Sequence, residues 1–177
     1  MKVRVRHTKL GKVRFVGNLD VTRLWERALR KAALPVAYST GFSPRPRLSF
    51  GLALPMAAGS VAEYVDIEFA TDVSLEGLAS RLSEALPVGF DVLTLTEKFP
   101  GQVSLQEDVV ACDWELELDG VPAEDARRAV DGAVAAPRLL LERERKGEFV
   151  PENERLALAV DVEESMKRCA RVVGACG

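Results

Sequence analysis

Residues 38–50, YSTGFSPRPRLSF, form the most constrained stretch of this chain. Pro44 and Pro46 fix their own φ angle, donate no backbone N–H, and push the residue before each of them toward extended backbone. We therefore predict a rigid, extended segment. Side chains alternate along an extended chain, so Arg45 and Arg47 should point to the same side. Two guanidinium groups held in this way favour an anionic partner.

Basic and acidic residues are distributed unevenly along the chain. Residues 1–50 carry 12 Lys and Arg against two acids, Asp20 and Glu26, for a net charge of +10. Residues 51–177 carry 12 Lys and Arg against 25 Asp and Glu, for a net charge of −13. A basic half favours an anionic partner, of which nucleic acid is the commonest; internal pairing of the two halves is the alternative.

Composition is that of a globular protein with one large or two small domains. The 177 residues are 47% hydrophobic and 29% charged, which is enough apolar material for a core in each domain. No apolar run approaches the length of a bilayer crossing, and the N-terminus lacks the apolar region of a secretory signal, so we expect a cytoplasmic location. The three cysteines show no CxxC spacing and are expected to be reduced thiols.

The first half is predicted to be an α+β domain, residues 1–98. Alternating and helical hydrophobic patterns give the order strand, helix, strand, strand, helix, strand, which is the ferredoxin-like split βαβ arrangement (βαββαβ). The corresponding ranges are 2–7 with 12–16 as a continuation or hairpin partner, a helix from Asn18 or Asp20 to about Ala33, 48–54, 61–69, 74–86 and 90–96.

The second half, residues 107–177, is predicted to be an acidic α+β unit that follows a linker at 99–106. Its pattern of strand, helix, strand, strand suggests a second, reduced ferredoxin-like half. The expected ranges are strands at 109–118, 138–143 and 155–162, a helix at 123–135, a hairpin turn at 143–149, and as an open alternative a short helix at 163–173.

Basic residues also follow one stripe of the first predicted helix. Arg23, Arg27, Arg30 and Lys31 fall within one arc, opposite an apolar stripe that should dock on the sheet. A charged stripe is normally just solvated, but a basic strand containing Arg4 and the two prolines with their arginines lie close by in sequence. The candidate anion-binding or nucleic-acid-binding residues are Arg4, Arg23, Arg27, Tyr38, Phe42, Arg45 and Arg47.

Two aromatic residues flank Gly41 in the constrained segment. Tyr38 and Phe42 are suited to stacking on bases, as exposed aromatics beside arginines do in proteins that bind single strands. The alternative is that Phe42 fills the core beneath the turn.

Motifs for the common kinds of catalysis are missing. The sequence has no P-loop, no GxGxxG, no HExxH and no paired cysteines, so we expect no cofactor and no metal. His7 ends a strand and is expected to be structural. Asp20 is the one candidate nucleophile or general base, facing Arg45, with helix capping or dipole pairing as the alternative.

Residues 12–68, from KVRFVGNLDVTRLWERALRKA through GFSPRPRLSF to EYVDIE, resemble the radical-SAM-linked protein family. This family of unknown function is found fused behind, or encoded beside, B12-binding radical SAM proteins. The resemblance is close over residues 1–97 and loose beyond them. Its members usually carry a histidine where this chain has Asn18. The resemblance implies a radical SAM protein as partner but supplies no reaction.

These observations predict an accessory module of a radical SAM system that binds an anionic partner, RNA above all, through its basic N-terminal face, without catalytic activity of its own. Two alternatives remain open. One is an RNA-modifying enzyme that uses Asp20, by fold analogy with pseudouridine synthases. The other is a protein–protein adaptor for the radical SAM enzyme.

Overall fold

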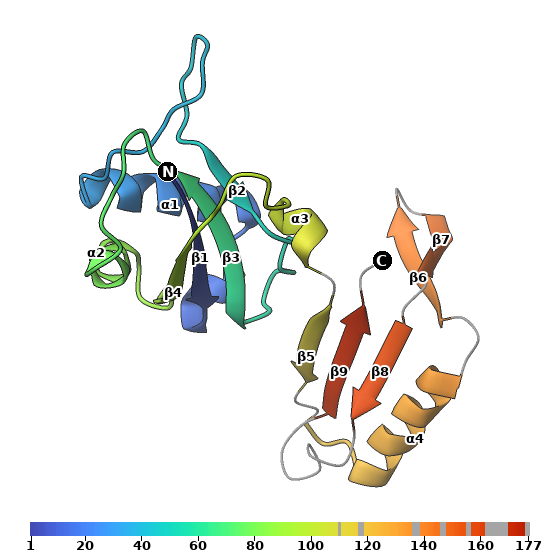
Figure 1. Cartoon of the computed structure of the whole chain (residues 1–177). Coiled ribbons are helices and arrows are strands. Elements are labelled where there is room, and N and C mark those ends of the chain that lie inside the picture. Colours follow the sequence, from blue (N-terminus) through green and yellow to red (C-terminus); the bar gives the residue numbers. More distant parts are fainter. Residues whose placement is uncertain are drawn as a thin grey trace. The chain divides into compact units, whose positions relative to one another are not determined.

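The computed structural model describes residues 1–109, 111–116, 119–135, 139–145, 148–154, 157–161 and 170–175. The chain divides into two compact units, Met1–Asp108 and Val109–Gly177 (Figure 1). The boundary falls after Asp108, so the segment expected to be a linker, residues 99–106, belongs to the first unit. The described part contains four α-helices, and none of them has the length and apolar character that a bilayer crossing requires.

The first unit is a four-stranded sheet with helices, which confirms the predicted α+β class. Its strands lie in the order β2-β3-β1-β4, every neighbouring pair is antiparallel, and the element order is compatible with the ferredoxin-like arrangement. The elements are β1 (Lys2–Lys9), α1 (Asn18–Lys31), β2 (Leu48–Phe50), β3 (Ser60–Glu68), α2 (Leu78–Ala85) and β4 (Val92–Glu97).

The core lies between one face of this sheet and the two helices. Val3 and Val5 of β1 are fully buried, as are Trp25 of α1 and Leu82 of α2. Because side chains alternate along a strand, Lys2, Arg4 and Arg6 of β1 lie on the opposite face. The predicted apolar stripe of α1 is therefore confirmed as its core-facing side.

Residues 12–16 do not form the predicted strand. Gly11 to Phe15 form η1, a 3-10 helix, of which only Val13 is buried. The physical reason is that β1 already pairs with β3 on one side and β4 on the other, so no sheet edge is left beside it. Gly11, at φ +63°, turns the chain away from the sheet, in a conformation that glycine adopts without strain.

The second face of the sheet is crossed by a strap, residues 98–108, which includes α3 (Leu105–Asp108). The Lys98 N–H donates to Lys2 O at 2.8 Å, and Gln106 Nε2 donates to Phe50 O at 2.6 Å. The strap thus contacts β1 at one end and β2, an edge strand, at the other (Figure 1). Leu105 is 2% exposed, so the strap buries an apolar side chain as well as making polar contacts.

The second unit combines a three-stranded antiparallel sheet, a helix and a hairpin. The sheet order is β5-β9-β8, and β6 pairs with β7. The elements are β5 (Cys112–Leu116), α4 (Ala123–Ala135), β6 (Leu139–Arg145), β7 (Glu148–Glu154), β8 (Ala157–Asp161) and β9 (Ala170–Ala175).

Two features of the second unit differ from the sequence-based expectations. β9 occupies Ala170–Ala175, where the alternative of a helix over 163–173 is therefore wrong; residues 162–169 lie outside the described residues. Val172 and Val173, both β-branched, pair with Trp114 and Asp113 of β5, and β-branched residues suit a ladder better than a helix. β7 was not expected because it contains Pro151 and three glutamates, residues depleted in strands.

Candidate anion-binding hairpin

Residues 37–47 form a hairpin that projects from the sheet of the first unit (Figure 1). Tyr38 and Pro46 face each other across it. The flanking bonds run from Ser39 N–H to Arg45 O at 2.9 Å and from Arg47 N–H to Ala37 O at 2.8 Å. Pro46 therefore lies at the position where the ladder needs no N–H, which is how the hairpin accommodates a proline.

The hairpin is anchored to the end of β3. Ala37 N–H donates to Glu68 O at 2.8 Å, and Glu68 N–H donates to Arg47 O at 3.1 Å. A third bond inside the hairpin, from Arg45 N–H to the Ser39 hydroxyl at 3.1 Å, fixes the arms close to the tip. The arms of the constrained segment are thus extended, as predicted. The segment is folded back into a hairpin rather than straight, because Gly41 at φ +126° allows the chain to reverse.

Phe42 lies in solvent at the tip of the hairpin. Its exposed fraction is 110% of the reference value, and Tyr38 is 47% exposed. The alternative that Phe42 fills the core beneath the turn is therefore wrong. A large apolar ring without any covering residue is informative, since such rings are usually packed away from water.

The two arginines of the hairpin differ in their surroundings. Alternation about Pro46 places Arg45 and Arg47 on one face of the hairpin, as the sequence predicts. Arg47 Nη1 lies 3.2 Å from Glu68 Oε1, and Lys2 Nζ lies 3.3 Å from the other oxygen of that carboxylate. Arg45 is exposed and has no acid within ion-pair distance among the described residues.

Glu68 is consequently held in its charged form. Burial would raise its pKa, but the hydrogen bonds and charges of Lys2 and Arg47 outweigh burial and lower the pKa below its ordinary value. Arg47 is therefore already partly neutralised, whereas Arg45 is not.

Arg4 is committed to an ion cluster beneath the strap. Its Nε and Nη2 bond to the two oxygens of Asp66 at 2.8 and 3.0 Å, and Nη1 bonds to Asp108. Lys98 Nζ reaches Asp66 at 2.9 Å. The Arg4 and Asp66 side chains are 12% and 9% exposed. The structure therefore leaves Arg4 no free donor edge for an external anion, unlike the expectation from sequence.

The charge asymmetry between the halves is partly resolved within the first unit. Met1–Asp108 carries 14 Lys and Arg against 12 Asp and Glu, a net charge of +2. Asp66 and Glu68 of β3 pair with Arg4 and Lys2 of β1, so internal pairing takes up part of the basic N-terminal segment.

On α1, the basic stripe faces solvent. Arg23 Nη1 pairs with Asp20 Oδ1 at 2.9 Å, one turn away. Arg27 and Arg30 are exposed, and no acid of the described residues pairs with either of them. The helix ends at Lys31, six residues before the hairpin begins, so the stripe and the hairpin are close neighbours in the chain.

Asp20 lies in the first turn of α1, on its exposed side. Its side chain is more than half exposed, and its partner is Arg23 rather than Arg45. The N-cap of α1 is Gly17, which has no side chain to cap the helix. Asp20 is therefore not a cap but a first-turn acid, whose negative charge interacts favourably with the helix dipole.

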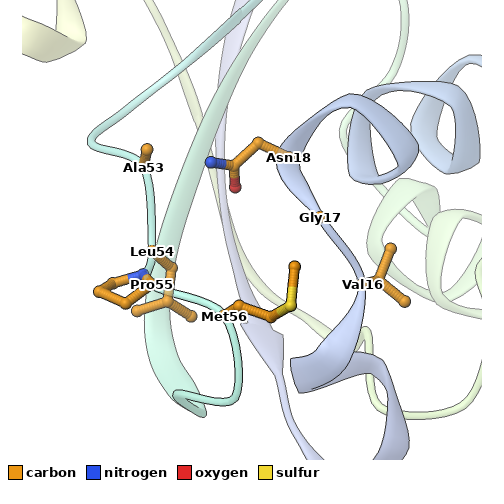
Figure 2. Close-up of a pocket in the computed structure, with 7 residues that line it drawn as sticks. All are labelled: Val16, Gly17, Asn18, Ala53, Leu54, Pro55 and Met56. Carbon is orange, nitrogen blue, oxygen red and sulfur yellow. The ribbon is translucent and has the colours of Figure 1, made fainter. Parts of the chain in front are cut away.

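A small pocket lies at the start of α1, where the sequence predicted no site (Figure 2). Its volume is about 280 Å³, and it is lined by Val16, Gly17, Asn18 and residues 53–56. Figure 2 shows the Asn18 side chain directed across the pocket toward Ala53 and Leu54. The pocket forms between two loops far apart in sequence, and the departure from the family pattern at Asn18 was the only signal at this place.

One family comparison covers nearly the whole chain. The family described as "Uncharacterized protein conserved in bacteria" (DUF2344) matches residues 2–172. The chain belongs to this family. The match extends over both units of this DUF2344 protein, including the second half, which the earlier resemblance covers only loosely. No curated protein matches the chain.

Two further features of the DUF2344 protein bear on its chemistry, its capacity for metal binding and the setting of its histidine. Among the residues that the structure describes, no group of three or more His, Cys, Asp or Glu is arranged to hold a metal ion. His7 is 2% exposed and packs against Trp25 and Phe90, with ring centroids 4.9 and 5.8 Å away. It is a core residue, as expected.

The structure thus brings only part of the predicted site together. Tyr38, Phe42, Arg45 and Arg47 belong to one hairpin, and Arg23 and Arg27 to the exposed face of the helix that precedes it. Arg4 lies apart, beneath the strap. Both groups of residues, on the hairpin and on the helix, are exposed.

Proposed function

We propose that this protein is an accessory module that binds an anionic partner, RNA above all, through the hairpin at 37–47 and the solvent face of α1. The observation that carries the proposal is the state of Arg45. It is exposed, three residues along the chain from the exposed Phe42 on a hydrogen-bonded hairpin, and no acid of the described residues lies within ion-pair distance of it, while Arg4 and Arg47 are paired internally.

Physical chemistry supports a phosphate partner for this surface. A guanidinium group offers a planar set of donors that matches phosphate oxygens. The hairpin is already ordered by its backbone bonds and two prolines, so binding would immobilise little additional chain. Arg27 and Arg30 of α1, which are exposed and unpaired with any acid of the described residues, offer further positive charges for phosphates.

The test is the salt dependence of RNA binding. Affinity for a labelled RNA should fall steeply as salt rises, because each neutralised phosphate releases counterions. Arg45→Ala should weaken binding at low salt and reduce the slope of log affinity against log salt by about 0.7 to 0.9 for the phosphate contact it loses.

Arg128→Ala is the matched control. It removes one exposed positive charge that already pairs with Asp125 in the second unit, and it should leave both affinity and slope unchanged. Equal binding by wild type, Arg45→Ala and Arg128→Ala at low salt would rule the proposal out.

An adaptor role is the second candidate, and the exposed Phe42 is the observation that favours it. We propose a B12-binding radical SAM protein as the partner on the strength of the family resemblance, and the cytoplasm as the location of both because the sequence has no apolar run of bilayer length. In this case the two proteins co-purify after nuclease treatment, and Phe42→Ala breaks the complex. A complex that nuclease dissolves supports RNA as the link instead.

A further inference from the structure

We infer that the hairpin recognises unpaired bases, so that the partner is single-stranded RNA or an unpaired loop. In this arrangement the Phe42 ring stacks on one base while Arg45 contacts a neighbouring phosphate. The inference rests on the proposed function and names its substrate class.

Phe42 offers an exposed aromatic ring. It is the most exposed large apolar side chain of the residues described, and the pairing of Ser39 with Arg45 places it in the turn of the hairpin. With an exposed fraction of 110% it is not shielded on either face of the ring. Both faces are therefore available for stacking, which a ring lying flat on the surface would not offer.

Hydrogen bonds between the two arms of the hairpin hold its tip in place. Bonds between Ser39 and Arg45 close the ladder just before the turn, and Pro44 and Pro46 restrict the backbone on one side of it. A flexible loop would lose conformational entropy when its ring is captured, whereas this hairpin has lost much of it on folding.

The Phe42 ring and the Arg45 guanidinium come from positions that are close together in the chain. Phe42 and Arg45 are three residues apart, so their Cα atoms lie at most about 10 Å from each other. A base and a phosphate of the same or the next nucleotide lie within this range. Tyr38, on the hairpin face opposite Arg45, offers a second ring for a further base, and this ring is about half exposed.

Stacking on an exposed ring distinguishes single-stranded RNA from an RNA duplex. In a paired A-form helix the faces of the bases are stacked on one another, and the major groove is deep and narrow. A ring can stack only on a base that is free of its neighbours, as in loops, bulges and single strands. Stacking on an exposed ring therefore requires an unpaired partner, while a purely electrostatic surface would accept both forms.

The experiment compares an oligouridine with a fully paired RNA duplex of equal length, using the whole chain and fluorescence anisotropy. Wild type should bind the oligouridine more tightly than the duplex. Phe42→Ala should weaken oligouridine binding about 5- to 150-fold, the range for loss of one base stack, and duplex binding little. Phe42→Leu keeps apolar bulk without a π face and should resemble Phe42→Ala, whereas Phe42→Trp should retain binding.

Val88→Ala is the matched control, because Val88 is almost fully exposed elsewhere in the first unit. It should change neither affinity. Thermal unfolding should be the same for all these variants, since Phe42 is not packed against the core.

The outcomes separate the two levels of the proposal. Equal binding of both RNAs, unaffected by Phe42→Ala but weakened by Arg45→Ala, overturns base stacking and leaves the anion-binding function standing. Wild-type affinity for the oligouridine in Phe42→Leu also overturns stacking. It would mean that apolar bulk alone is enough at this position and that no π face is needed. Failure of wild type to bind either RNA overturns both.

Discussion

His7 is the only histidine of the chain, and its burial makes it a pH-dependent element of stability. Burial between Trp25 and Phe90 lowers its pKa to about 4 from the ordinary 6.5, although a bond to the Thr8 carbonyl opposes the shift. The neutral form is thus the one that the folded state prefers.

Stability should therefore fall as the pH is lowered through 6.5 toward 4, because the unfolded chain takes up the proton first. The full difference corresponds to about 3 kcal/mol, and above pH 6.5 no loss is expected. Urea unfolding at a series of pH values measures it, with His7→Gln as the reference that lacks the titration. Glu63, whose pKa burial raises, acts in the opposite direction in both proteins and cancels in the comparison. A pH profile identical in both would contradict this account.

Single residues show where sequence reasoning succeeds and where it stops. The common side of Arg45 and Arg47 followed from alternation alone. The pairing of Arg4 did not, because its partner Asp66 is 62 residues away and is brought opposite only by the register of β1 with β3. A basic residue on a strand can be recognised from sequence, but whether it is free depends on the neighbouring strand.

At the scale of elements, the strap is the feature with the clearest energetic consequence. It closes over Asp66, which accepts bonds from Arg4 and Lys98 and whose pKa is lowered below its ordinary value because these two cations outweigh the effect of burial. All three side chains are nearly buried, so each depends on the others for compensation of its charge.

Asp66→Ala should accordingly destabilise the protein by about 3–5 kcal/mol, because in a poorly hydrated place it removes the carboxylate that Lys98 pairs with and leaves Arg4 with Asp108 alone. The measurement is the free energy of unfolding in urea. Glu68→Ala is the control on the same strand, where the ion pairs with Lys2 and Arg47 are more exposed and a loss of only about 0–1 kcal/mol is expected. Equal losses in the two variants would show that the strap does not shield the cluster.

The helices and strands of the first unit were predictable because each carries its own hydrophobic period. Exceptions arose where the outcome depends on what already occupies the sheet. Residues 12–16 alternate like a strand but find no free edge beside β1, and residues 99–106 look polar enough for a linker although Leu105 is buried. The hairpin was predicted only in part. The prolines indicated a stiff segment, but the reversal of the chain at Gly41 follows from the pairing of the two arms, which the sequence alone does not show.

At the scale of the whole molecule, the division of the chain determines which part should carry the proposed function. The hairpin, α1 and the strap all belong to Met1–Asp108. A boundary at residue 98, as the sequence suggested, would cut the strap away from the sheet that it crosses.

Two truncated proteins distinguish these boundaries. Residues 1–108 should unfold cooperatively and keep the RNA affinity of the whole chain, including its dependence on Arg45, since every contact described for the hairpin lies within them. Residues 1–98 lose the buried Leu105, the Gln106 bond to Phe50 and the Asp108 partner of Arg4. They should be less stable by several kcal/mol, because an apolar side chain of this size contributes about 1.5–3 kcal/mol on burial and the uncovered ions add to it. Urea unfolding of both truncations, read beside the RNA titration, measures this; equal stability would mean that the strap is only a connection.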